Sequence, residues 1–188
     1  TASRVVCSTF GRELETRLIE EGTAIADTFI FDRLTEVNND ILVDKGAGTT
    51  AEIVIVDRAN GILDTYHIGD SNQILVYDNG EMEYITPIPP KDPSPTTPPD
   101  KTLGMYEFSK DATRSDHISQ LLTHRTIKLS DLQRKPAYVI CTTDGLTNAL
   151  SYEEISTILR DHKIGRESPQ DLLDALAEAA KVPYDHIV

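Results

Sequence analysis

The chain has 188 residues, of which 39% are hydrophobic and 26% are charged, a composition typical of one soluble globular domain spanning residues 1–188. A net charge of −13, with no stripe of lysine or arginine, argues against nucleic acid or an anionic membrane surface as a partner. No apolar run is long enough to cross a bilayer, and Cys7 and Cys141 are too few for a disulfide framework, so we expect an intracellular protein without a membrane span.

Two helices are expected at the start of the chain. Ser8 or Thr9 is a suitable cap for a first helix. In that segment Phe10, Leu14 and Leu18 recur at every fourth residue. A second helix is indicated by apolar residues that fall roughly on one face, namely Ile25, Phe29, Leu34, Val37 and Ile41.

The pattern then changes from helix to strand. We expect strands near residues 51–57, 63–69, 72–78 and 137–143, with a further candidate in the stretch "RTIKLSDL". Asn60-Gly61 and Asn79-Gly80 predict two-residue hairpin turns, so that residues 51–86 would form an antiparallel meander. The strands carry β-branched residues on both faces, which favours sheets covered by each other on one side and by helices on the other.

A proline-rich segment comes after the expected meander. Seven of the ten prolines lie between Pro87 and Pro99, and no sheet interior tolerates that density. Residues 87–100 are therefore predicted to be a surface loop. The same segment could instead dock a protein partner as a polyproline stretch, but a spacer is the commoner role of such segments.

Two capped helices are predicted in the last part of the chain. Ser151 and Glu154 have the spacing of a capping box, and Ser168-Pro169 is typical of a helix start. Helices, then strands, then strands and helices again predict an α+β domain instead of an alternating βαβ fold.

Three short motifs abut the predicted strands, in this order: "GAGTTA" (residues 46–51), "HIGDSNQILVY" (67–77) and "VICTTDGLTNALSYEEI" (139–155). Each is unremarkable by itself. Together and in this order they resemble the metal-dependent protein phosphatases of type 2C, and the resemblance extends over nearly the whole chain. It implies two packed antiparallel sheets flanked by helices, and hydrolysis of phosphoserine or phosphothreonine in a phosphoprotein substrate.

The resemblance also implies a metal site. Family members bind Mg²⁺ or Mn²⁺ through carboxylates, and the ions activate a water molecule for attack on phosphorus, so no catalytic side chain acts as the nucleophile. By the motifs, Asp144 corresponds to a ligand of the paired metals and Asp70 to a ligand of a third, weaker one. Gly69 and Gly145 would then serve the backbone geometry of the two turns. If β-strand neighbours bring the two turns together, both carboxylates are expected at one edge of the sheets. A hairpin-turn role alone is the simpler interpretation of Asp70.

Other parts of the family pattern are not found in this sequence. The Asp-Gly-His-Gly stretch and the final aspartate motif that supply further ligands are missing. Asn148 stands where an aspartate is frequent, and Asn72 stands where an arginine is usual. Two interpretations are open: an active phosphatase whose remaining ligands lie outside these residues, or a catalytically inactive domain that serves as a binding or regulatory module. In either case we expect residues 1–188 alone to be an incomplete catalyst with little response to metal.

Overall fold

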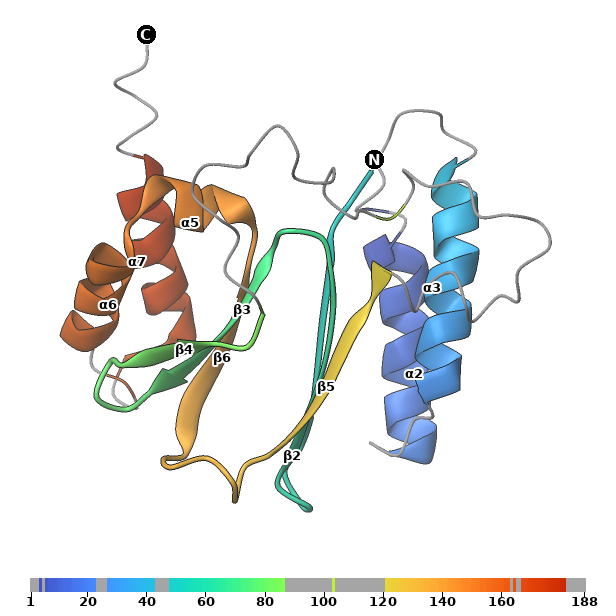
Figure 1. Cartoon of the computed structure of the whole chain (residues 1–188), viewed down its shortest axis with the longest axis horizontal. Coiled ribbons are helices and arrows are strands. Elements are labelled where there is room, and N and C mark those ends of the chain that lie inside the picture. The colour runs from blue at the N-terminus through green and yellow to red at the C-terminus, as the bar shows by residue number, and fades with distance from the viewer. Residues whose placement is uncertain are drawn as a thin grey trace, which may run out of the picture. The chain divides into compact units, whose positions relative to one another are not determined.

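The computed structural model describes residues 4, 6–22, 27–42, 48–86, 103, 121–162, 164 and 167–181. Two compact units are present, each built from two segments of the chain. The first contains Thr1–Gly69 and Pro98–Asp131, and the second contains Asp70–Thr97 and Leu132–Val188. Each unit has a three-stranded antiparallel sheet and its own helices (Figure 1). The predicted α+β class, with antiparallel sheets flanked by helices, is confirmed.

The first unit opens with helical structure. A π-helical turn, η1 (Val6–Phe10), runs directly into α2 (Gly11–Glu21), and α3 (Asp27–Leu42) comes next. The predicted cap at Ser8 or Thr9 was wrong, because the chain is already helical through both residues and the N-cap position of α2 is Phe10. Phe10 is buried in the core of this unit.

The sheet of the first unit has the order β1-β2-β5. Its strands are β1 (Ala51–Asp57), β2 (Ile62–Ile68) and β5 (Thr123–Lys128). Alternate residues of β1 face the helices: Ala51, Ile53 and Ile55 belong to the same buried cluster as Leu34 and Val37 of α3. This period of two is what the β-branched run of β1 predicts for a strand covered by helices on one face.

The sheet of the second unit has the order β4-β3-β6. Its strands are β3 (Asn72–Tyr77), β4 (Met82–Tyr84) and β6 (Pro136–Thr142). The predicted continuous meander over residues 51–86 was therefore wrong at its centre. The two edges of β2 are paired with β1 and β5, and those of β3 with β4 and β6, so β2 and β3 belong to different sheets although only three residues separate them.

The helices of the second unit confirm the predicted helix starts. They are α5 (Asp144–Ala149), α6 (Tyr152–Asp161) and α7 (Pro169–Lys181). Ser151 and Glu154 form the capping box at the start of α6, with both reciprocal hydrogen bonds present. Ser168 and Asp171 bond to each other in the same way before α7. Both helices bury leucines and isoleucines in one cluster with β3, β4 and β6, including Ile155, Leu159, Leu172 and Leu176.

The turn at Asn60-Gly61 is in the predicted place but longer than predicted. Residues 58–61 separate β1 from β2, and Gly61 has a φ of +64°. The carboxylate of Asp57 accepts hydrogen bonds from the backbone N–H and the side-chain amide of Asn60, at 2.9 and 2.8 Å. This side-chain bonding stabilises a wider loop than the two-residue turn that Asn-Gly alone suggests.

Some predictions fall on residues that the structure does not describe. The whole proline-rich segment 87–100 lies outside the described residues, and so does Ile25. Among the described helices, none is both long enough and apolar enough to span a membrane.

Candidate functional site

The sheet of the second unit places the two motif aspartates at the same end. Strands β3 and β6 are antiparallel neighbours, and Asn72 pairs with Thr142 at one end of their ladder. Asp70 lies two residues before Asn72 in the chain, and Asp144 lies two residues after Thr142. Both aspartates are half-buried, and both therefore lie at the same end of the two paired strands.

Asp144 is the first residue of α5, directly after the end of β6. A carboxylate at this position interacts favourably with the partial positive charge of a helix start. The side-chain amide of Asn148, one helical turn later, donates a hydrogen bond to Oδ2 of Asp144 at 3.0 Å. One oxygen of the Asp144 carboxylate thus has a neutral donor within its own helix.

A second set of hydrogen bonds connects the Asp70 turn with α5. The side-chain amide of Asn72 donates to Oγ1 of Thr147 at 3.3 Å and, at the long limit of 3.5 Å, to the backbone carbonyl of Asp70. The hydroxyl of Thr147 in turn donates to the carbonyl of Asp144 at 3.3 Å. These contacts were not anticipated from the sequence, because Asn72 and Thr147 are far apart in the chain.

The two motif glycines have different environments. Gly69 has a φ of +106°, and a Cβ atom there would lie 2.4 Å from Cγ2 of Thr50. A side chain is therefore excluded at this position both by the backbone conformation and by contact with Thr50. Gly145 lies inside α5 and its φ is not positive, so β6 leads into a helix start and not into a tight glycine turn.

The described residues provide the type of ligand that a hard divalent cation prefers, but too few of them. Carboxylate oxygens suit Mg²⁺ and Mn²⁺. Asp70 and Asp144 are two such groups at one sheet edge, whereas no group of three or more His, Cys, Asp or Glu side chains able to hold a metal ion occurs in the part of the chain that the structure describes. Two carboxylates do not fit a two-ion centre, so we assign no catalytic step to such a centre within these residues.

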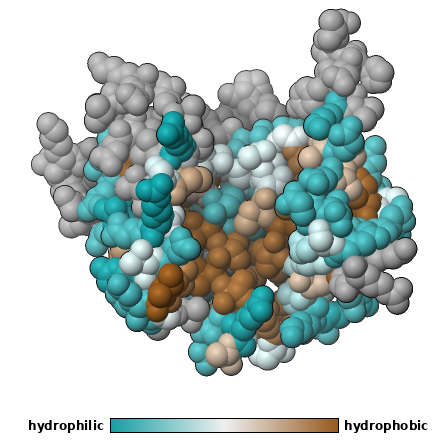
Figure 2. Space-filling view, turned by 180° about the vertical axis from the view of Figure 1, so that it is seen from behind, coloured by the Kyte–Doolittle hydropathy of each residue, from teal (hydrophilic) through white to brown (hydrophobic). Residues whose placement is uncertain are grey.

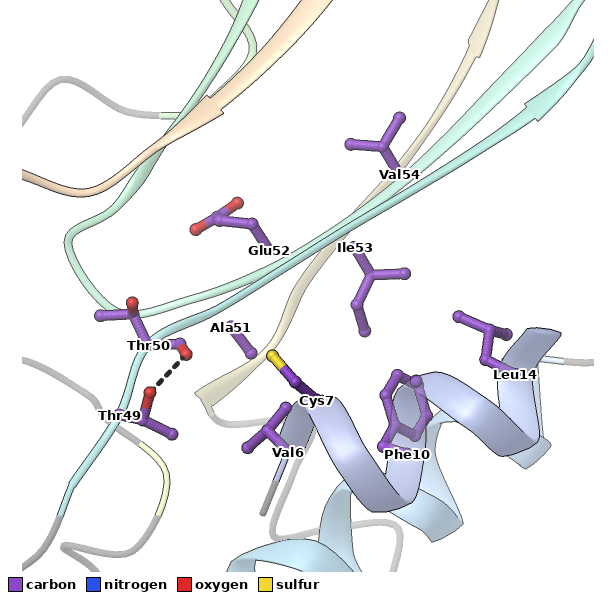
Figure 3. Close-up of a pocket in the computed structure, with 11 residues that line it drawn as sticks. Val6, Cys7, Phe10, Leu14, Thr49, Thr50, Ala51, Glu52, Ile53 and Val54 are labelled. Atoms are coloured by element: carbon purple, nitrogen blue, oxygen red, sulfur yellow. Dashed lines mark hydrogen bonds between the residues drawn. The ribbon is translucent and has the colours of Figure 1, made fainter. Parts of the chain in front are cut away.

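A pocket is present in the first unit, between β1 and the helical segment η1–α2 (Figure 3). It has a volume of about 340 Å³. Figure 3 shows Phe10 and Leu14 on the helical side and Ile53 on the strand side, while the side chain of Glu52 points away from the helices. Among the described residues the lining is thus mainly apolar and holds no converging charged groups, which a site for phosphate chemistry requires. All its lining residues belong to the unit without Asp70 and Asp144.

Apolar side chains also reach the surface. Figure 2 shows a brown, hydrophobic area on the face opposite to that of Figure 1. Large apolar residues that are exposed in the described part of the chain include Val56 of β1 and Leu173 of α7. Nothing in the structure identifies what would cover them.

A buried ionisable pair in the first unit, His67 and Glu52, was not predicted from the sequence. Nδ1 of His67 lies 2.5 Å from Oε1 of Glu52, and the two side chains are only 11% and 9% exposed. The four-residue loop after β1 places Glu52 opposite His67 in the register. A two-residue loop at Asn60-Gly61 would have placed Glu52 opposite Gly69 instead, so the correct loop length was the signal needed to find this pair.

Comparisons with solved structures show what fold this is. A variant of a bacterial serine phosphatase matches with a TM-score of 0.60 and 20% identity, over 90% of this chain and 67% of that one. The unsubstituted bacterial serine phosphatase matches with a TM-score of 0.55 and 18% identity, over 82% of this chain and 63% of that one. Serine/threonine phosphatase Stp1 from Staphylococcus aureus matches with a TM-score of 0.57 and 18% identity, over 85% of this chain and 63% of that one.

Comparisons of the sequence do not assign the chain to a family. No protein-family model matches the chain, and no curated protein matches it. The chain spans 63% to 67% of the length of the three solved phosphatases described above. At identities of 18% to 20% the likeness concerns the fold, and the chain therefore has the fold of bacterial serine/threonine phosphatases.

Proposed function

We propose that this chain is part of a metal-dependent protein serine/threonine phosphatase of type 2C, which hydrolyses phosphoserine or phosphothreonine in phosphoprotein substrates. The observation that carries the proposal is the pairing of Asn72 with Thr142. It brings Asp70 of the Gly-Asp-Ser motif and Asp144 of the Thr-Asp-Gly motif to the same end of the paired strands. If the two motifs share one metal site, their aspartates must lie near each other in this way. The fold agrees with this assignment, since the solved neighbours are phosphatases.

In this proposal Asp144 and Asp70 are ligands for Mg²⁺ or Mn²⁺. Asp144 takes the position of a ligand to the paired ions, and Asp70 that of a ligand to a third ion. Gly69 fixes the turn that carries Asp70, because no other residue fits against Thr50. Among the described residues no further group completes a metal site, so in this proposal the remaining ligands come from other parts of the complete protein.

The alternative is a catalytically inactive domain that binds phosphoproteins or other partners. Asn148 favours this alternative, because it places an amide, and not a third carboxylate, beside Asp144. The possible partner of the proline-rich loop stays a prediction, since residues 87–100 lie outside the described residues.

The test is release of phosphate from phosphoserine and phosphothreonine peptides by the complete protein, with Mn²⁺ and with excess EDTA. We expect activity with Mn²⁺ that EDTA removes and that Asp144→Asn lowers by at least about 10²-fold, since the loss of a metal ligand weakens the activation of water. The matched control is Asp161→Asn, which changes an exposed carboxylate at the end of α6 and should leave the rate unchanged. Activity that survives chelation would contradict the metal requirement. No activity at any Mn²⁺ concentration would favour the inactive binding domain.

A further inference from the structure

Asn72 is a polar residue in a fully buried position. It is the first residue of β3, and its exposed fraction is 0%. Burial of an uncharged amide is costly unless its hydrogen bonds are made. The partners that Asn72 does reach are the two segments that carry the motif aspartates: the Asp70 carbonyl at the end of one turn and Thr147 in α5.

The direction of the hydrogen bonds fixes the orientation of the Asn72 amide. The hydroxyl of Thr147 has one proton, which is donated to the carbonyl of Asp144, so its oxygen accepts from Asn72. The nitrogen Nδ2 of Asn72 must therefore face Thr147. The oxygen Oδ1 is then left on the other side, buried and without a hydrogen-bond partner among the described residues.

The hydrogen bonds of the Asn72 side chain contribute little to the free energy of folding. The two bonds from Nδ2 are long, at 3.3 and 3.5 Å, and the unsatisfied Oδ1 carries a desolvation penalty. Leucine has a similar size and would fill the same space without an orphaned acceptor. What leucine cannot do is connect the Asp70 turn to the helix that begins at Asp144.

We propose that Asn72 is a positioning residue: through Thr147, its buried amide ties the Asp70 turn to the first turn of α5 and so holds the Asp70 and Asp144 carboxylates in a fixed relation. The inference rests on the proposed function, because the relation matters only where the two carboxylates act together. Its structural part, the hydrogen-bond connection itself, is measurable in metal-free protein whether or not the protein is an enzyme.

The first experiment compares Asn72→Leu with the wild type by thermal unfolding and by NMR without metal. We expect a melting temperature equal to the wild type or higher by up to roughly 4 °C, because an orphaned acceptor is removed. At the same time the backbone amide resonances of Asp70 and Asp144 should shift, since their link is lost. A lower melting temperature with unchanged resonances at Asp70 and Asp144 would overturn the proposal, because Asn72 would then serve stability alone.

A second set of variants tests the link from the side of α5. Thr147→Val removes the hydroxyl, whereas Thr147→Ser keeps it. We expect Thr147→Val to shift the side-chain amide resonances of Asn72 and the backbone amide resonance of Asp70. In Thr147→Ser both should stay close to their wild-type positions. The control is Thr157→Val in α6, whose hydroxyl donates to the carbonyl of Glu153 in its own helix and accepts from Arg160 instead of Asn72. Equal effects of Thr147→Val and Thr157→Val on Asn72 would contradict the link.

The activity readout separates this inference from the proposed function. In the complete protein, Asn72→Leu should lower phosphate release by about 10²-fold, because small displacements of reacting groups have effects of that size. If the wild type is inactive, the proposed function fails, while the NMR arms still decide whether Asn72 couples the two turns. If the wild type is active and Asn72→Leu is equally active, the positioning role fails and the proposed function stands.

Discussion

Gly69 lies so close to Thr50 that a Cβ atom on the glycine would meet Cγ2 of Thr50 at 2.4 Å. The glycine also has a φ of +106°, a backbone conformation that residues with a side chain rarely adopt. Thr50 belongs to the motif of residues 46–51 and directly precedes β1, and Gly69 opens the turn that leads to Asp70. The two motifs thus meet through a packing contact between Thr50 and Gly69.

Substitution of Gly69 by alanine should destabilise the protein strongly. We expect Gly69→Ala to lower the free energy of unfolding by roughly 2–4 kcal/mol, the sum of backbone strain and overpacking against Thr50. Urea denaturation measures the change. Gly22→Ala is the control, because Gly22 also has a positive φ, of +73°, but no described atom lies within 4 Å of the new Cβ. That variant should lose about 1–3 kcal/mol from backbone strain alone, and less than Gly69→Ala. Equal losses would show that contact with Thr50 is unimportant.

Tyr77 should make stability fall at high pH. Burial and a hydrogen bond from its hydroxyl to the carboxylate of Glu83, at 2.8 Å, raise the pKa of Tyr77 to about 12. The unfolded chain has a pKa near 10 at this residue, so the folded state binds the proton more tightly. The stabilising contribution is therefore complete below about pH 10 and is lost as the pH rises from about 10 to 12.

Tyr77→Phe should remove this part of the pH dependence. We expect the drop in unfolding free energy between about pH 9 and pH 11 to be smaller in Tyr77→Phe by roughly 1 kcal/mol, since Glu83 is exposed and the bond is partly screened. Urea unfolding at both pH values gives the difference. Glu83→Gln keeps an acceptor without the charge and should have an intermediate effect. An unchanged drop in Tyr77→Phe would mean that other groups govern this pH range.

The capping box before α6 should contribute measurably to stability. Ser151→Ala removes the acceptor of the Glu154 N–H bond, and we expect a loss of about 1 kcal/mol in the free energy of unfolding. Glu154→Ala removes the return bond to the Ser151 backbone. Because the two bonds form one motif, the double variant should lose less than the sum of the single variants. Strict additivity in this thermodynamic cycle would speak against reciprocal capping.

Asn148→Asp should convert an amide donor beside Asp144 into a like charge. Without metal, we expect the free energy of unfolding to fall by about 1 kcal/mol and the melting temperature to fall with it. The causes are the lost hydrogen bond and the repulsion between the two carboxylates within α5. Addition of Mn²⁺ should raise the melting temperature of Asn148→Asp more than that of the wild type, because a third carboxylate is then available. Asn148→Ala loses the same hydrogen bond without adding charge. If Asn148→Ala responds to Mn²⁺ as strongly as Asn148→Asp, the added carboxylate is not the cause.

Local structure was largely predictable from the sequence. The strand 51–57 was predicted with the observed bounds, and the strands expected at 63–69, 72–78 and 137–143 are within one residue of β2, β3 and β6. The capping box of α6 was found from Ser151 and Glu154 alone. These features depend on side-chain periodicity and on contacts between residues close in the chain, which a sequence displays directly.

The first helix and the loop after β1 were predicted less well. The helical structure extends backwards past Ser8 to Val6, and Phe10 at the end of this turn is buried in the core of its unit. The bonds from Asn60 to Asp57 widen the turn that Asn-Gly suggested. The capping preference of serine and the turn preference of Asn-Gly do not include these side-chain environments, and the wider turn also set the register that pairs Glu52 with His67.

Periodicity, capping and short spacings were enough to predict most helices and strands, the α+β class and the motif residues Asp70 and Asp144. The pairing of the strands was not predictable in this way: β2 and β3 lie in different sheets, and β3 pairs with β6. Strand pairing joins residues about seventy positions apart, and every apolar strand offers several partners of similar energy, so local signals do not select among them. That choice brought Asn72 to Thr147 and placed both aspartates at one edge of the sheet.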